Sequence, residues 1–360
     1  MTGQVTAQEL KALLSKNEML LIDVRTPGEY GSWRINEGIN IPVDTLEDSI
    51  RSIPKDKQVI TICAHGIRSK AAAEFMRSKG YTAKSVLGGM AAWNSVYDTA
   101  SVDISTNDAR VVQVRRLGKG CIGYFVISKG EAAVIDPTAH LQEYINMAAK
   151  LNCRITKVFD THQHADHVSG ARALANLVGA KVFLNPLDAY KFSGFQQIMD
   201  NDKILIGDAE IEALHTPGHT KGSTSFLINN VLITGDTLFV DGVARPDLRD
   251  KSEEFAEDLF NTYHNKILSM NDSTNILPGH FDTGSRIEFG TPLTSQLGTV
   301  RKGLIVFDYS KSEFIRSFRN VPPKPPNYER IIRINNGDSP FDPEIAEELE
   351  EGPNRCVVKA

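Results

Sequence analysis

The stretch from His162 to His167 contains the residues with the clearest chemistry in this sequence. Three histidines and one aspartate lie within six positions: His162, His164, Asp166 and His167. Imidazole nitrogens and carboxylate oxygens are the ligands that borderline cations such as zinc and iron take in proteins. A polar surface loop would give no reason for so many histidines to gather, so the pattern predicts a metal site.

Three further residues of ligand type follow in similar local settings. His219 comes after a Pro-Gly turn, Asp236 ends the apolar run that starts at Val231, and His280 follows a second Pro-Gly turn. Loops of this kind, placed after strands, aim side chains into clefts. We therefore expect these three residues to complete the site begun by the histidine cluster.

The elements around the cluster explain how it is positioned. Residues 155–159, Ile-Thr-Lys-Val-Phe, are mostly apolar or β-branched, which predicts a buried strand. From Val168 onward, apolar residues recur at helical spacing through Ala171, Leu174 and Leu177. The cluster is thus predicted to occupy the loop at the carboxyl end of a strand, just before a helix.

The order His-x-His-x-Asp-His, followed by single His, Asp and His residues, resembles the metallo-β-lactamase superfamily. The resemblance covers about the last two-thirds of the chain. It implies an αββα sandwich with the metal between the loops at one edge. Two members of the superfamily carry the same seven residues with different metal content, and both alternatives are open at this point.

The resemblance to persulfide dioxygenases implies a single Fe(II), bound by His162, His219 and Asp236. Two histidines and one carboxylate leave three positions open for a substrate sulfur and O₂. Four other residues would then orient the ligands: His164, Asp166, His167 and His280. The product would be sulfite, formed from a low-molecular-weight thiol persulfide.

The resemblance to glyoxalase II implies instead a thioester hydrolase with one or two zinc ions. Asp236 would bridge the two metals and activate a water between them. One metal would be bound by His162, His164 and His219. The other would be bound by Asp166, His167 and His280.

The segment after Asp236 favours the dioxygenase. It reads Val243-Ala-Arg245-Pro-Asp247, which is similar to the dioxygenase pattern. Arg245 is a candidate for binding a substrate carboxylate, and a salt bridge to Asp247 is the alternative. The chain departs from both groups at Phe281-Asp282, and a cysteine often found before the family arginine is absent. The identity of the thiol, whether glutathione, coenzyme A or another, is therefore open.

A second candidate site lies near the N-terminus. Residues 59–62 predict a buried strand that runs directly into Cys63, and a helix is predicted from Lys70 to Lys79. Backbone N–H groups at a helix N-terminus favour an anion, and Arg68 adds a positive charge. Both effects stabilise a thiolate or a bound persulfide at Cys63.

The segment from about Ala7 to about Trp93 resembles a single-domain rhodanese, an α/β domain with a small parallel sheet. The matching pieces are Asp23-Val-Arg25, Glu29-Tyr30, Cys63 to Arg68 and Leu87-Gly-Gly. The six-residue loop length goes with sulfur transfer in that family. The resemblance implies that Cys63 carries a sulfane sulfur with Arg68 as a catalytic partner, that Gly66 and Ile67 bind substrate, and that Asp23 and Arg25 form a structural ion pair.

Length and composition limit the remaining possibilities. A chain of 360 residues predicts two domains, which we place at residues 1–97 and 109–360 with a polar linker at 98–108. The net charge of −5 gives no electrostatic reason to expect nucleic-acid binding, and the apolar runs are too short for a membrane helix. The N-terminus lacks the pattern of a secretory signal. Four cysteines without a disulfide or zinc spacing indicate a reducing, cytoplasmic setting.

The expected partners are small-molecule thiols, persulfides and thiosulfate, and a homo-oligomer is possible. A third alternative is that one domain is degenerate and serves only as a binding module without catalysis, although Cys63, Arg68 and the unbroken ligand set argue against it.

At the C-terminus, Glu344 to Glu351 predicts an acidic helix with a solvated face. Cys356 is interpreted as an incidental thiol.

Overall fold

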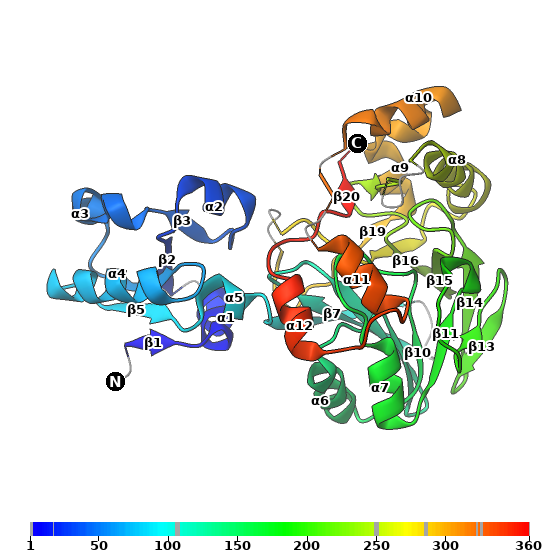
Figure 1. The fold of residues 1–360 in the computed structure, drawn as a ribbon, viewed down its shortest axis with the longest axis horizontal. Coiled ribbons are helices and arrows are strands. Elements are labelled where there is room, and N and C mark those ends of the chain that lie inside the picture. The colour runs from blue at the N-terminus through cyan, green and yellow to red at the C-terminus, as the bar shows by residue number, and fades with distance from the viewer. Residues whose placement is uncertain are drawn as a thin grey trace.

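The computed structural model describes residues 3–16, 18–104, 109–247, 252–283, 287–321, 323–324 and 327–359. A smaller N-terminal body and a larger C-terminal body lie side by side (Figure 1). Within the described ranges, no helix has both the length and the apolar character needed to span a membrane.

The N-terminal domain has one sheet of five parallel strands, in the order β1-β5-β4-β2-β3. Its strands are β1 (Gln4–Val5), β2 (Met19–Asp23), β3 (Gly38–Asn40), β4 (Gln58–Ile62) and β5 (Ala83–Val86). Its helices are α1 (Ala7–Lys16), α2 (Pro27–Ser32), α3 (Leu46–Ser49), α4 (Ile67–Ser78) and α5 (Gly89–Trp93). The predicted small parallel sheet is confirmed, and β4 ends directly before Cys63.

The C-terminal domain contains two large sheets packed face to face. The seven-stranded sheet has the order β12-β11-β10-β9-β8-β7-β6, and the six-stranded sheet has the order β13-β14-β15-β16-β18-β19. The strands of the first are β6 (Tyr97–Val102), β7 (Arg110–Arg116), β8 (Ile122–Ser128), β9 (Glu131–Ile135), β10 (Arg154–Phe159), β11 (Lys181–Leu184) and β12 (Gln196–Gln197). Those of the second are β13 (Lys203–Ile206), β14 (Ala209–His215), β15 (Thr224–Ile228), β16 (Val231–Gly235), β18 (Asn275–Pro278) and β19 (Ser295–Gln296).

Helices cover the outer face of each sheet and complete an αββα sandwich. One outer layer contains α6 (Leu141–Leu151) and α7 (Ala171–Val178), and the other contains α8 (Ser252–Thr262), α9 (Leu297–Gly303) and α10 (Lys311–Ser317). Apolar side chains of both inner faces, among them Phe159, Phe226 and Ile233, fill the space between the sheets. Burial of this apolar area is the main stabilising term of the fold. The predicted sandwich is confirmed.

The predicted linker is wrong over its first half. Residues 97–102 form strand β6, which pairs antiparallel with β7 at the edge of the seven-stranded sheet. Their alternating burial explains why a polar composition still makes a strand: Ala100 and Val102 are buried while Ser101 is exposed. Residues 105–108 of the predicted linker lie outside the described residues.

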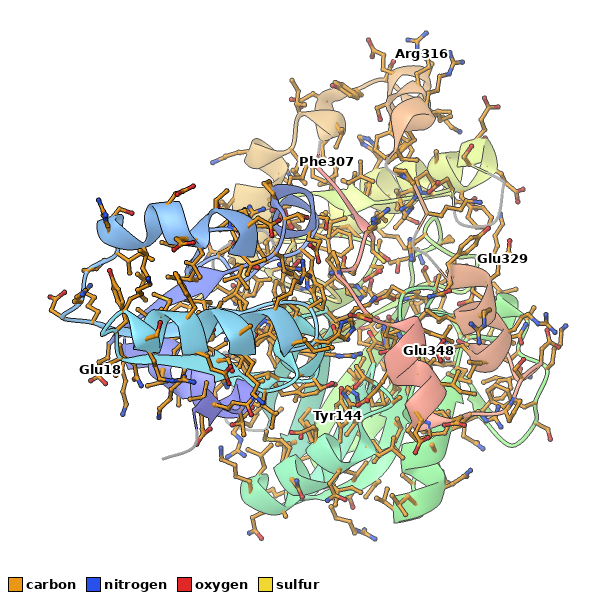
Figure 2. All side chains as sticks on the ribbon, turned by 60° about the vertical axis from the view of Figure 1, so that its left-hand side comes forward. Glu18, Tyr144, Phe307, Arg316, Glu329 and Glu348 are labelled. Carbon is orange, nitrogen blue, oxygen red and sulfur yellow. The ribbon has the colours of Figure 1, made fainter. Side chains whose placement is uncertain are left out.

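The C-terminal segment packs along the junction of the two domains. It comprises α11 (Tyr328–Asn335), α12 (Pro343–Leu349) and β20 (Val357–Val358), which pairs with β17 (Val243–Ala244). In Figure 1 the red chain after α12 runs along the side of the larger domain that faces the smaller one. Figure 2, with Glu348 labelled on α12, shows the same segment beside the N-terminal domain from another direction.

The acidic helix α12 was expected to have a solvated face, and this expectation is wrong at the carboxyl end of the helix. Ala346 and Leu349 are buried, and Glu350 is 1% exposed because it forms an ion pair with the buried Arg116. The second carboxylate oxygen of Glu350 accepts a hydrogen bond of 2.6 Å from the Val168 backbone N–H. The two domains are joined by the 2.7 Å hydrogen bond from Trp33 Nε1 to the Gly118 carbonyl.

Candidate functional site

The seven predicted metal-site residues meet at one edge of the sandwich. The histidine cluster follows β10, and His219, Asp236 and His280 follow β14, β16 and β18 respectively. All seven side chains are nearly fully buried, with exposed fractions of 2% or less. The structure therefore brings together every residue that the sequence assigned to this site, from four separate loops.

Two aspartates that the sequence did not single out hold these loops in place. Asp136 accepts hydrogen bonds from the Thr161 backbone N–H (2.7 Å) and hydroxyl (2.8 Å), which fixes the start of the histidine cluster. Asp188 accepts from the backbone N–H groups of Gln163 (2.7 Å) and Gly222 (2.8 Å), and so ties the loop after β10 to the loop after His219. Only the tertiary contacts identify these two residues.

Asp236 depends on a glycine immediately before it. Gly235 has a φ of +51°, and a Cβ there would lie 2.4 Å from the Thr161 hydroxyl oxygen. A left-handed backbone without a side chain is therefore required for β16 to end against the histidine loop. This close approach places the carboxylate of Asp236 next to the histidine rings.

Five buried ligand atoms have no hydrogen-bond partner among the described residues. They are His162 Nε2, His164 Nδ1, His167 Nε2, His219 Nε2 and Asp236 Oδ2. The Nε2 atoms of His162 and His219 lie 3.8 and 3.6 Å from Asp236 Oδ2. Buried polar atoms are normally paired, and a shared cation satisfies nitrogen and oxygen atoms in this arrangement. These residues fit a metal ion.

His280 is placed differently, because both of its ring nitrogens face carboxylates. Its Nδ1 lies 2.5 Å from Asp236 Oδ1, and its Nε2 lies 2.7 Å from Asp166 Oδ2. The other oxygen of Asp166 lies 3.1 Å from His167 Nδ1. His280 and Asp166 therefore orient neighbouring ligands, as carboxylate–histidine pairs do around metals.

Cys121 is a member of this neighbourhood that the sequence did not indicate. Its Sγ lies 3.5 Å from Asp166 Oδ2 and 3.6 Å from His167 Nδ1, and its backbone pairs with His280. The thiol is buried just before β8. Its distance in sequence from the histidines, with no metal-type spacing, explains why pattern analysis missed it.

The electrostatics divide the cluster into two kinds of histidine. Burial lowers the pKa of His162 and His219 below the ordinary value, so both rings are neutral and free to bind a metal. Burial opposes protonation of His280 as well, but Asp166 and Asp236 outweigh it and raise its pKa well above the ordinary value. Burial would raise the pKa of Asp236, yet His280 and the other imidazoles lower it, and the carboxylate is ionised.

Arg245 is buried and paired with a carboxylate two residues further along the chain. Its side chain is fully buried and forms two bonds to Asp247, Nε–Oδ1 at 2.8 Å and Nη2–Oδ2 at 2.9 Å. Its carbonyl accepts a hydrogen bond of 2.9 Å from His219 Nδ1. The salt bridge to Asp247, which the sequence left as the alternative, is present, and binding of a substrate carboxylate by Arg245 stays a prediction.

The Cys63 loop has the predicted form between β4 and α4. The backbone N–H of Ser69 lies 3.3 Å from Cys63 Sγ, so a helix N-terminus faces the sulfur. Gly66 caps the helix with a φ of +88°. Gly89 is packed so closely on the loop that a Cβ would lie 2.1 Å from the Cys63 carbonyl oxygen. These glycines let the backbone wrap around the thiol.

The charged residues near Cys63 pair with each other. Asp23 and Arg25 form the expected ion pair, 2.6 Å long and buried. Arg68 forms two bonds to Glu29, at 2.9 and 2.6 Å, and the hydrogen bond from Arg68 lowers the pKa of Glu29 to about 2. The positive charge of Arg68 is therefore shared with a carboxylate. Substrate binding by Gly66 and Ile67 stays a prediction.

Cys356, which the sequence suggested to be an incidental thiol, lies buried beside the metal-site residues. Its side chain is 1% exposed, and its Sγ groups with ligand atoms of Asp236 and His280, all within 4.8 Å of one another. Burial raises the pKa of this thiol well above its ordinary value. The sequence does not reveal this location, because the C-terminal segment reaches the metal centre through the pairing of β20 with β17 and through hydrogen bonds from Asn354 to the Lys119 and Phe281 carbonyls.

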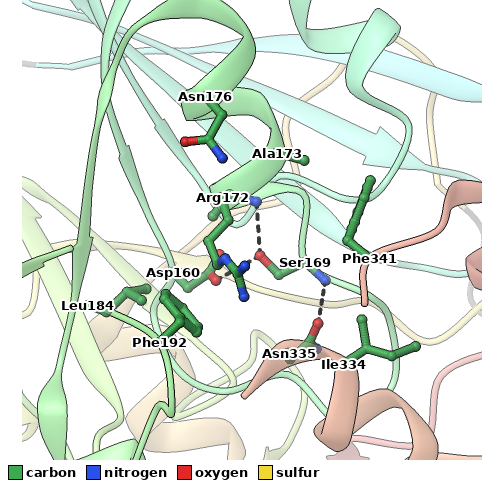
Figure 3. Close-up of a pocket in the computed structure, with 11 residues that line it drawn as sticks. Asp160, Ser169, Arg172, Ala173, Asn176, Leu184, Phe192, Ile334, Asn335 and Phe341 are labelled. Carbon is green, nitrogen blue, oxygen red and sulfur yellow. Dashed lines mark hydrogen bonds between the residues drawn. The ribbon is translucent and has the colours of Figure 1, made fainter. Parts of the chain in front are cut away.

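A cavity of about 230 Å³ is lined by Asp160, Ser169 and Asn335 among other residues (Figure 3). Asp160 Oδ2 accepts a 2.7 Å bond from the Ser169 hydroxyl there, and Arg172 lies over the ring of Phe192 at 4.0 Å. Asn335 donates hydrogen bonds of 2.9 Å to the carbonyls of His164 and His167. These polar contacts support the metal-binding loop from its outer side.

Comparison with known proteins agrees with this architecture. Residues 6–96 match the model of the rhodanese-like domain, and residues 121–327 match that of the metallo-beta-lactamase superfamily. The cytoplasmic hydroxyacylglutathione hydrolase of Arabidopsis thaliana is 31% identical over 237 residues, which are 63% of this chain and 86% of that protein.

Two solved structures are similar to the C-terminal part. A metallo-beta-lactamase from Staphylococcus aureus has 29% identity and a TM-score of 0.59, covering 64% of this chain and 73% of that one. ETHE1 from Myxococcus xanthus has 26% identity and a TM-score of 0.57, covering 63% of this chain and 97% of that one. Since the superfamily model spans more than half of the sequence, this chain belongs to the metallo-beta-lactamase superfamily and carries an N-terminal rhodanese-like domain.

Proposed function

We propose that the C-terminal domain oxidises a low-molecular-weight persulfide at a single Fe(II), and that the N-terminal domain transfers sulfane sulfur through Cys63. The metal would be bound by His162, His219 and Asp236. The supporting observation is that each of these three residues has one free, buried ligand atom, while His280 and Asp166 have their ring nitrogens and carboxylate oxygens in mutual hydrogen bonds.

The seven residues form two groups that differ in how many of their ligand atoms are free, and this difference favours one metal over two. A second ion in the glyoxalase II arrangement would need Asp166, His167 and His280, and of these only His167 has an unpaired ligand atom. Binding it would break the hydrogen bonds of His280 to two carboxylates. The His162–His219–Asp236 group needs no such rearrangement.

The net reaction takes one persulfide, one O₂ and one water to one thiol and one sulfite. Bound Fe(II) supplies open coordination positions and the redox chemistry that zinc lacks. The protein's part is to keep His162 and His219 neutral and to hold Asp236 ionised through His280, in a site whose residues are buried.

In the N-terminal domain, the Cys63 thiolate would attack the outer sulfur of thiosulfate and release sulfite. The persulfide formed on Cys63 would lie against the N–H of Ser69, where the helix N-terminus favours negative charge. A small thiol would then accept the sulfur. Free thiols at all four cysteines agree with the reducing, cytoplasmic setting that we propose.

A dinuclear zinc hydrolase is the second candidate. His164 Nδ1 and His167 Nε2 are also free and buried, which two metals would use. The 31% identity with a hydroxyacylglutathione hydrolase points the same way. Fused to a rhodanese-like domain, such an enzyme would hydrolyse a thioester of a small thiol.

Metal analysis and oxygen uptake distinguish the two candidates. Protein purified without added metal should contain about one iron per chain. Loaded with iron under anaerobic conditions, it should consume O₂ with glutathione persulfide or coenzyme A persulfide and release sulfite. Two zinc ions per chain, no oxygen uptake with either persulfide, and rapid hydrolysis of S-lactoylglutathione would reject the dioxygenase.

A further inference from the structure

The turn from His164 to Ser169 is held from outside the metal centre by two buried side chains of the C-terminal segment. Asn335 is the last residue of α11, and Glu350 directly follows α12. Both lie beyond residue 327, where the match to the metallo-beta-lactamase superfamily ends. The contacts that they make with the turn therefore come from outside the matched part of the fold.

Asn335 uses its whole side-chain amide on this turn. Its Nδ2 donates hydrogen bonds of 2.9 Å to the carbonyls of both His164 and His167. Its Oδ1 accepts a bond of 2.9 Å from the Ser169 backbone N–H, which is drawn in Figure 3. An asparagine amide offers two N–H donors and one carbonyl oxygen, so every polar atom of this side chain is engaged. The three bonds fix the backbone on both sides of Asp166.

Glu350 binds the same turn between these contacts. One of its carboxylate oxygens accepts the 2.6 Å hydrogen bond from the Val168 backbone N–H, and the other forms the ion pair with Arg116. Arg116 Nε in turn donates a 2.7 Å bond to the carbonyl of Asn94, so the N-terminal domain helps to fix this anchor. Since both oxygens of the buried carboxylate are paired, Glu350 is a rigid support for the turn.

Apolar packing reinforces the two polar anchors. The side chain of Val168 is fully buried in a small cluster with Ile331 and Ile334 of α11 and Ala346 and Leu349 of α12. The spacing of three residues within each helix places both apolar members on the same face. The turn is thus held to the two helices by side-chain packing as well as by hydrogen bonds.

We propose that Asn335 and Glu350 are positioning residues that set the metal affinity of the centre by fixing the turn from His164 to Ser169. This inference rests on the metal site of the proposed function, and it applies whether one ion or two are bound. Removal of a group that orients metal-binding side chains typically lowers the affinity for the metal about 10- to 100-fold. Four hydrogen bonds to the turn make Asn335 and Glu350 groups of this kind.

The effect reaches the predicted ligand Asp236 through two hydrogen-bonded side chains. Asp166, in the middle of the held turn, has its Oδ2 2.7 Å from His280 Nε2. The other ring nitrogen of His280, Nδ1, lies 2.5 Å from Asp236 Oδ1. A shift of the turn would therefore change the orientation of Asp236 in the single-metal arrangement. In the two-metal arrangement it would displace Asp166 from the second ion.

Titration of the metal-free full chain with Co(II) tests the inference. Co(II) takes the nitrogen and oxygen ligands that Zn(II) and Fe(II) take, and its visible absorption reports the geometry of those ligands. In Asn335→Ala we expect the Co(II) affinity to fall about 10- to 100-fold and the absorption band to change. The control is Asn336→Ala, because the Asn336 side chain bonds to Asp338 instead of the turn. The control should bind Co(II) as the wild type does.

Glu350→Gln tests the second anchor. The glutamine oxygen can still accept from the Val168 N–H, but the charge that pairs with Arg116 is lost, so a fall in Co(II) affinity is expected here too. Circular dichroism at the titration temperature shows whether each variant is folded. Asn335→Ala leaves no buried charge unpaired, so it decides the question even if Glu350→Gln does not fold.

Three outcomes would overturn the inference. Equal Co(II) affinity and an unchanged spectrum in the wild type and Asn335→Ala would show that Asn335 contributes only to stability. An equal loss of affinity in Asn336→Ala would show that the effect does not come from the turn. If the wild type binds no Co(II), the metal site itself is rejected, and the proposed function fails with it. Persulfide oxidation is not part of this readout, so a failed dioxygenase assay leaves the titration result unchanged.

Discussion

The Cys63 loop and the metal centre differ in how far apart along the chain their functional atoms lie. The thiol, the capping glycine and the N–H that faces the sulfur all fall between Cys63 and Ser69. The metal centre instead draws on four loops between His162 and His280, and Cys356 adds a fifth segment. A local loop is specified by its own sequence, whereas the metal centre exists only when both sheets are packed.

The two sites also differ in how their polar groups are satisfied. Near Cys63, Arg68 pairs with Glu29 and Arg25 pairs with Asp23, so the charges are balanced within the protein. At the metal centre, five buried ligand atoms have no partner among the described residues. A bound cation would relieve that deficit, and metal binding should accordingly contribute to the stability of the C-terminal domain alone.

The largest effect is expected from Asp236→Ala. This carboxylate is the only anionic ligand of the predicted single-metal site, and its loss leaves two neutral imidazoles. Metal content measured by mass spectrometry should fall from about one ion per chain to nearly none. His215→Ala is the control, because His215 contacts the Lys221 carbonyl and lies outside the cluster. Full metal retention in the Asp236 variant would contradict the ligand assignment.

Cys63→Ser should abolish thiocyanate formation from thiosulfate and cyanide while metal content stays at the wild-type level. A serine hydroxyl is not a nucleophile of comparable strength at neutral pH. The Cys63 loop lies between β4 and α4 of the N-terminal domain, whereas the metal-site residues follow strands of the C-terminal domain. A thiocyanate assay and a metal analysis on the same preparation check the loss of sulfur transfer and the unchanged metal content. Retained sulfur transfer would show that another thiol is responsible.

His280→Ala should have an intermediate effect that separates one metal from two. If His280 only orients Asp236 and Asp166, its removal should weaken metal affinity about 10- to 100-fold while one ion still binds at saturating metal. Titration with Fe(II) under anaerobic conditions, with His215→Ala alongside, measures this. Loss of one ion from a pair would instead identify His280 as a ligand and support the hydrolase.

Glu29→Gln should have the smallest effect. The Arg68–Glu29 pair is about one-third exposed, so its loss should cost at most about 1 kcal/mol. Because the folded-state pKa of Glu29 is lowered to about 2, its contribution is present above the ordinary value of 4.5 and is lost as pH falls toward 2. Both tryptophans, Trp33 and Trp93, lie in the N-terminal domain, so urea unfolding followed by their fluorescence reports on it. If the wild type and Glu29→Gln differed in their free energy of unfolding by the same amount at pH 7 and at pH 2.5, this prediction would be contradicted.

Periodicity and spacing in the sequence determined the elements and the seven-residue metal set. Apolar runs such as the one that starts at Val231 mark buried strands, because a strand between two packed layers must be apolar on both faces. Three histidines within six residues identify a metal loop on composition alone. The loop after β4 is likewise local, so Cys63 could be assigned without knowledge of any distant contact.

Tertiary structure alone decided which ligand atoms are free and which distant groups join the site. Asp136, Asp188 and Cys121 act through contacts between segments that no spacing rule connects. The polar stretch at residues 97–102 became strand β6 because an edge of the sheet was available to pair with it. Cys356 reached the metal centre because β20 pairs with β17, a contact whose partners are more than a hundred residues apart. Local sequence carries no information about such pairings, since they depend on the packing of the whole domain.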